Sequence, residues 1–127
     1  MKTIISTPKA PSAIGPYNQA TAFDKLIFTS GQIALDPATM EIVIGGVKEQ
    51  TKQVMENLKA VLEEAGSSFE NVLKTTCYLS DMDNFVAFNE VYGQYFKGET
   101  APARSTVAVK TLPKNVLVEV DTIAFKN

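Results

Sequence analysis

The sequence predicts an α+β domain in which a mixed β-sheet carries two helices on one face. Short segments that alternate apolar and polar residues, as strands with one buried face do, are interrupted by two segments whose apolar residues recur every three or four positions. The expected order is βββαβαββ, and short connections between such elements favour a two-layer arrangement. No repeat, linker or low-complexity tract divides the chain, so we expect one domain over residues 1–127.

Three strands are expected in the first third of the chain. Residues 17–23 and 26–30 form two strands separated by a tight turn, and a shorter strand is expected over residues 41–44. The second of these strands ends at Ser30-Gly31, where a glycine allows another group to approach the backbone closely. A bulge or bend is the commoner role of such a glycine, and both interpretations stay open.

A proline-rich segment, residues 8–18, precedes these strands. Its three prolines and one glycine exclude a regular helix, whereas Ile14 and Tyr17 are apolar enough to pack on the body of the domain. We therefore expect an ordered loop. Tyr17 fits either a core position, which the residue type favours, or a cleft position with an accessible hydroxyl.

The first helix is expected over residues 47–65. Apolar residues form one stripe along it, charged residues cover the opposite face, and Gly66 follows as a helix stop. A strand is expected next, over residues 71–79. Its cysteine, Cys77, falls in the apolar stripe and is expected to be structural, because no neighbouring basic residue would activate the thiol.

The second helix is expected over residues 84–96, with an aspartate before it as a cap. An aromatic stripe follows its helical period and is expected to belong to the core; it comprises Phe85, Phe88, Tyr92, Tyr95 and Phe96. Asn89 lies near this stripe and is polar enough either to be exposed or to point into a cleft.

The last quarter of the chain is expected to form a β-hairpin. Residues 101–109 and 116–121 both alternate in polarity, and residues 112–115 between them include a proline and an asparagine suited to a turn. In that hairpin Arg104 and Glu119 would lie about 13 Å apart along the strands. Charged groups on sheet-building strands are costly to desolvate unless they pair with each other or hold a ligand, and both outcomes stay open.

Composition excludes several classes of function. The chain has no histidine, which removes Ser-His-Asp and Cys-His hydrolases and His-ligated zinc. Its formal net charge of −2 and pI near 5.1 lack the basic excess typical of nucleic-acid-binding proteins. We expect no membrane span and no signal peptide, and the single cysteine fits a reducing compartment, so a cytoplasmic location is expected.

Several motifs in chain order resemble the RidA (YjgF) family. They are Ala13–Tyr17, Thr29–Gln32, Leu73–Thr76 with Tyr78–Leu79, Pro102–Ser105, Leu112–Pro113 and Val118–Val120. The resemblance runs from about Thr3 to the end of the chain. It implies a chorismate-mutase-like α+β fold that assembles as a homotrimer with clefts between its subunits.

The same resemblance implies an activity and a set of site residues. RidA proteins hydrolyse reactive 2-imino acids (2-iminobutanoate and 2-iminopropanoate) to 2-oxo acids and ammonia, which removes damaging metabolites. By position, Arg104 would bind the substrate carboxylate and Glu119 would hold the attacking water. The residues expected to line the cleft with them are Tyr17, Ser30, Gly31, Asn89, Ser105 and Thr106. Some members carry cysteine where this chain has Thr106, so a thiol role is excluded there.

The chemistry is plausible without the family name. An arginine offers a permanently charged, bidentate clamp for a carboxylate, and a glutamate can orient one water while taking its proton. We therefore expect neither a cofactor nor a metal. The alternatives are a non-enzymatic regulator that binds 2-oxo acids or similar carboxylates in the same inter-subunit cleft and an RNA-acting protein, which the acidic pI disfavours.

Overall fold

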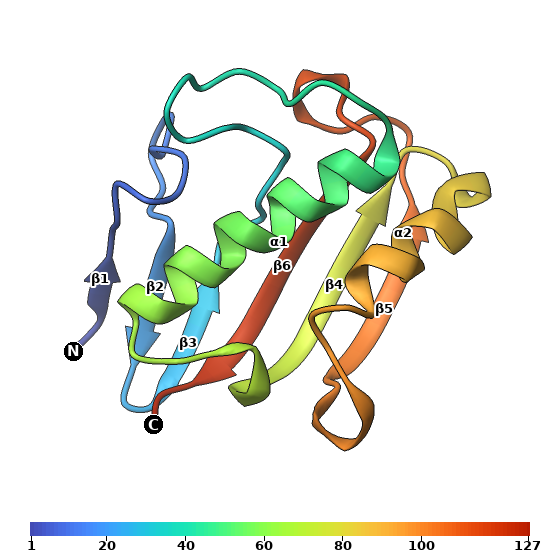
Figure 1. The fold of residues 1–127 in the computed structure, drawn as a ribbon. Helices are drawn as coiled ribbons and strands as arrows, with labels where there is room; N and C mark the ends of the chain where they lie inside the picture. The colour runs from blue at the N-terminus through green and yellow to red at the C-terminus, as the bar shows by residue number, and fades with distance from the viewer.

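The computed structural model describes residues 1–127 and shows two layers, a six-stranded sheet with both helices on one face (Figure 1). The expected α+β class is confirmed. The elements are β1 (Thr3–Ile5), β2 (Ala20–Phe23), β3 (Leu26–Thr29), α1 (Val47–Glu64), β4 (Val72–Leu79), α2 (Phe85–Tyr92), β5 (Ala103–Ala108) and β6 (Val118–Phe125). Neither helix has the length and apolar character that crossing a membrane requires.

The strand order in space is β1-β2-β3-β6-β4-β5, so the strand that comes last in the chain lies in the middle of the sheet (Figure 1). The expected hairpin between β5 and β6 is wrong. Strand β5 pairs in parallel with β4, while β6 pairs antiparallel with both β4 and β3. Alternating polarity predicts strands without naming their partners, and the connection over residues 109–117 is long enough to cross the end of β4.

The first strands also differ from expectation. Strands β2 and β3 lie inside the expected ranges, but residues 41–44 form only an isolated bridge between Ile42 and Leu35. Three strands do precede α1, but the one that the sequence did not predict is β1. Only Ile5 of its three residues is buried, and a segment this short cannot show an alternating pattern.

The helices supply most of the core. The apolar stripe of α1 is fully buried against the sheet through Val54, Leu58 and Val61, as its period predicts. Helix α2 is shorter than the expected range of 84–96, since it gives way to turns at Gly93, a residue that weakens helices. The aromatic residues after that point still pack inward, with the Phe96 ring 4.8 Å from Tyr92.

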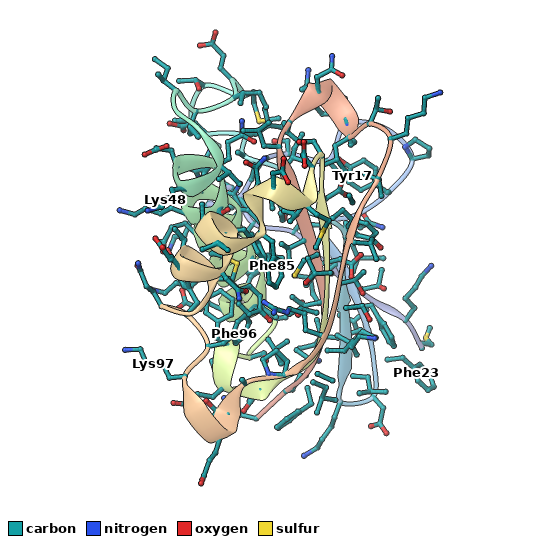
Figure 2. All side chains as sticks on the ribbon, turned by 90° about the vertical axis from the view of Figure 1, so that its right-hand side faces the viewer. Tyr17, Phe23, Lys48, Phe85, Phe96 and Lys97 are labelled. Carbon is teal, nitrogen blue, oxygen red and sulfur yellow. The ribbon has the colours of Figure 1, made fainter.

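The sheet face without helices is unusually apolar. Its exposed side chains include Phe23, Leu26, Phe28 and Phe125. Figure 2, which views the molecule from its side, shows Phe23 beyond the sheet and Phe85 and Phe96 between the sheet and the helices. Exposed apolar side chains gathered on one face of a small domain indicate an interaction surface.

Candidate active site

The predicted site residues are divided between the two faces of the sheet. On β5, Arg104 lies beside the fully buried Thr75 of β4 and points to the helix side. On β6, Glu119 alternates with the buried Val118 and Val120, so its side chain leaves the opposite face. A single chain therefore does not bring Arg104 and Glu119 to one ligand.

The strand register also separates the two residues within the sheet. Arg104 pairs with Thr75 and Glu119 with Tyr78, three positions further along β4. With two strand spacings between β5 and β6, the two Cα atoms lie roughly 14 Å apart. This separation is close to the expected value of about 13 Å, although it arises with β4 between the two strands and not in the expected hairpin.

The Arg104 guanidinium is held by side chains of α2. Its Nη1 donates a hydrogen bond to Asn89 Oδ1 at 2.6 Å, and its Cζ lies 4.8 Å from the centre of the Tyr92 ring and 5.4 Å from that of Phe85. These three residues recur at helical spacing on one face of α2. The Tyr92 hydroxyl is fixed in turn by Thr75 Oγ1 at 2.8 Å.

A cavity of about 480 Å³ opens beside Arg104 and Asn89. Asn89 thus points toward a cleft, the second of its two sequence interpretations. Phe85 and Tyr92 were assigned only to the core; their spacing from Asn89 was the available signal that they also surround the arginine. Stacking on two rings limits the rotamers of Arg104 and orients its remaining N–H groups.

The neighbours of Arg104 along β5 divide between the faces. Thr106 lies on the same side as Arg104, and its hydroxyl is buried without a hydrogen-bond partner. Ser105 points to the opposite face and is exposed. Beside Thr106 lies Cys77, whose pKa burial raises to about 11, in agreement with a structural cysteine.

The Glu119 carboxylate lies in a second cavity, of about 540 Å³. The predicted residues Tyr17, Ser30 and Gly31 line it, together with Lys114, which the sequence did not single out. Tyr17 is 49% exposed, so it is a cleft residue and the core interpretation is wrong. Its hydroxyl oxygen accepts a hydrogen bond from the Ile14 N–H at 3.3 Å.

The wall of the Glu119 cavity depends on one buried amide, Gln19. Its Nε2 donates to the carbonyl oxygens of Thr7, Ala10 and Pro11, and its Oε1 accepts from the Thr7 N–H at 2.6 Å. The main-chain carbonyl oxygen of Gln19 also accepts a hydrogen bond from the Ser30 N–H at 2.9 Å. These contacts fold the proline-rich loop over the cleft, and no sequence pattern announced the role of Gln19.

Electrostatics favour a proton-accepting role for Glu119. Burial raises the pKa of its carboxyl above the ordinary value, and the nearby Asp121 carboxylate raises it further. Asp121 is itself paired with the Tyr78 hydroxyl, which donates to Oδ2 at 3.4 Å. A carboxylate whose pKa moves toward neutrality is a stronger base at physiological pH.

One backbone donor near Glu119 is available to a small polar ligand. The Gly31 N–H donates to no group of the chain. No cluster of three or more histidine, cysteine, aspartate or glutamate side chains is placed to hold a metal ion. The groups that the cleft offers a ligand are a carboxylate, the Gly31 N–H, hydroxyls, the Gln32 side-chain amide and one lysine.

Comparison with known proteins identifies the family. A model of the Endoribonuclease L-PSP family, also called the RidA or YjgF family, matches residues 7–126. The chain belongs to this family. A RutC family protein of Pyrococcus abyssi is 55% identical over 125 residues, which cover 98% of each chain. The sequence resemblance is thus confirmed.

Two further RidA-family comparisons concern activity and fold. The mouse 2-iminobutanoate/2-iminopropanoate deaminase is 48% identical over 126 residues, covering 99% of this chain and 93% of the mouse protein. A crystal structure from Thermotoga maritima superimposes with a TM-score of 0.96 at 50% identity and covers 100% of this chain and 99% of that one. The fold therefore agrees with the family over its whole length.

Proposed function

We propose that this RidA-family protein hydrolyses 2-imino acids such as 2-iminobutanoate and 2-iminopropanoate to 2-oxo acids and ammonia. The observation that carries the proposal is the half-buried Glu119 carboxylate, whose pKa is raised and which faces a cleft with a free backbone N–H. The identity with the mouse deaminase supports the same reaction.

The substrate carboxylate would bind Arg104. Asn89 and the two aromatic rings hold the guanidinium from behind, which leaves its other N–H groups for a bidentate contact. Thr106 lies on the same side of β5, but its hydroxyl is buried and it does not line the Arg104 cavity, so Arg104 is the group that would meet the substrate here. This side of the site orients the imine and contributes no proton transfer.

Glu119 would activate the water. The substrate reacts as the iminium ion, protonated from solvent. The carboxylate takes one proton from the water as the water oxygen bonds to the C=N carbon, and the π electrons move to the nitrogen, which becomes an amine. Glu119 then returns its proton to this nitrogen, the C–N bond breaks as ammonia leaves, and the hydroxyl proton returns to solvent, in place of the one that the imine took up, as the C=O bond of the 2-oxo acid forms. Glu119 is the acid–base group that the chain supplies, and no step requires a redox partner.

A homotrimer with clefts between subunits would assemble this site. Arg104 and Glu119 leave opposite faces of one sheet, so a complete site needs Arg104 from one subunit and Glu119 from its neighbour. Two features support such an assembly. Strand β5 is a sheet edge, and the helix-free face is apolar enough to be covered by another copy.

The test is 2-oxo acid release from freshly generated 2-iminobutanoate, trapped with semicarbazide. Wild type should accelerate hydrolysis, and Arg104→Ala and Glu119→Gln should each lose at least about 100-fold in kcat/KM while remaining folded. Lys97→Ala, on the exposed turn after α2, serves as a surface control. A folded wild type without acceleration would refute the proposal and favour a carboxylate-binding regulator, which would keep ligand affinity in Glu119→Gln.

A further inference from the structure

The pairing of residues 26–32 with β6 contains a β-bulge. Strand β3 pairs with β6 regularly as far as Phe28 and Ile123, and pairing resumes at an isolated bridge between Gln32 and Val120. From the first pair to the second, the chain advances four positions from Phe28 to Gln32, whereas β6 spans three positions, from Ile123 to Val120. The extra residue lies in the Ser30-Gly31 region, so the bulge, one of the two interpretations open from the sequence, is present.

The bulge is fixed on both sides. Gln32 and Val120 exchange two backbone hydrogen bonds, of 2.9 and 3.2 Å. Ser30 donates its N–H to the Gln19 carbonyl at 2.9 Å and its hydroxyl to the Asn18 carbonyl at 2.6 Å. Gly31, between these anchors, therefore has little freedom to move away from its neighbours.

The Glu119 carboxylate occupies the space that a side chain at position 31 would need. A Cβ added to Gly31 would lie 2.8 Å from Glu119 Cδ and 3.0 Å from Cγ, and closer still to Oε2. The backbone of Gly31 is not in the left-handed region. Conformation therefore does not require glycine here, whereas the position of the Glu119 carboxylate does.

We propose that Gly31 is a positioning residue: the bulge presents a bare backbone against which the Glu119 carboxylate rests, in the orientation that water activation needs. This inference rests on the proposed function of Glu119. The bulge changes the direction of the chain at the end of β3. Because Gly31 has no side chain, the Glu119 carboxylate can lie directly against its backbone. A methyl group at position 31 displaces the carboxylate and leaves the Arg104 side unchanged.

The kinetic test compares Gly31→Ala with Gly46→Ala, because a Cβ at Gly46 would meet its nearest atom at an ordinary 3.9 Å. We expect kcat for 2-iminobutanoate to fall about 100-fold in Gly31→Ala, with KM changed less than about threefold, since a misplaced catalytic group costs rate rather than affinity. Gly46→Ala should retain kcat. A kcat within twofold of wild type in folded Gly31→Ala would overturn the proposal.

A second readout does not depend on turnover. NMR titration of ¹³C-labelled glutamate, with the Glu119 signal assigned through Glu119→Gln, should show the pKa of Glu119 falling toward its ordinary value in Gly31→Ala as the carboxylate moves toward solvent. An unchanged titration would contradict the proposal. If wild type itself hydrolyses no imine, the proposed function fails, while this titration still decides whether Gly31 positions Glu119.

A third readout covers loss of folding. Should Gly31→Ala be unstable, Gly31→Ala combined with Glu119→Ala removes the clashing atoms, and its thermal midpoint should return to that of Glu119→Ala alone. Recovery would show that the clash with Glu119 is the cause. A double variant as unstable as Gly31→Ala would show instead that the glycine serves the backbone, and the proposal would be wrong.

Discussion

The two sides of the candidate site are built in different ways. Arg104 is held by side chains alone, two rings and one amide that a single helix presents at regular spacing. Glu119 rests instead on main chain, in a cleft whose wall is tied together by the buried amide of Gln19. Replacing one residue of α2 changes one contact of the Arg104 guanidinium. Losing one contact in the wall of the Glu119 cleft instead shifts a backbone segment that carries several of the lining groups.

The largest expected effect tests whether the two sides meet between subunits. Arg104→Ala and Glu119→Gln, each expected to lose at least about 100-fold in activity, are unfolded together in equal amounts, refolded and assayed. Random trimers should recover up to about a quarter of wild-type activity, because that fraction of interfaces pairs an intact Arg104 with an intact Glu119. Simple mixing without refolding is the control. Activity that stays at the level of the single variants, despite mixed assembly, would contradict the shared site.

The next effect compares the two supporting amides. Gln19→Leu should lower the free energy of unfolding by about 2–4 kcal/mol, because Gln19 is 3% exposed and its loss strands several buried backbone groups. Asn89→Leu, at a half-buried position with one side-chain partner, should cost less than about 1 kcal/mol. Chemical denaturation of both variants measures the difference. Equal losses would remove the distinction between the two sides.

The smallest effect concerns pH. The pKa of Glu119 is raised in the folded protein above its ordinary value of 4.5, by burial and then by Asp121. A raised pKa means that this group's contribution to stability is complete below about pH 4 and is lost as pH rises through the folded pKa. Glu119→Gln should therefore have a higher thermal midpoint than wild type at pH 7.

The pH prediction has two checks. The gain from Glu119→Gln should vanish below about pH 4, where both forms are neutral. Asp121 also has a raised pKa through burial, with Tyr78 and Lys74 opposing the shift, so Asp121→Asn should behave in the same direction. A stability gain that is independent of pH would show that ionisation is not its origin.

Much of the architecture could be predicted from the sequence. Helical periodicity identified α1, and alternation identified five of the six strands, because burying one face imposes those periods directly. The site residues came from motifs rather than from periodicity. Strand partners could not be predicted, since β4 and β6 would satisfy a local pattern equally well beside several neighbours.

The face of Arg104 shows why the site could not be assembled from sequence. In β5 the apolar Val107 lies on the open face, 45% exposed, while Arg104 and Thr106 point toward the helices. The usual assignment of apolar residues to the core is inverted there. The open face is itself apolar, so polarity no longer distinguishes inside from outside.

The place of β6 has a consequence for synthesis of the protein. Because β6 lies between β3 and β4, the strands made earlier remain two separate pieces of sheet until residues 118–125 leave the ribosome. The nascent chain thus holds unpaired edges until its last strand emerges, and completion of the fold is a late, single event. That strand also carries Glu119, so the carboxylate and the closed sheet arrive together.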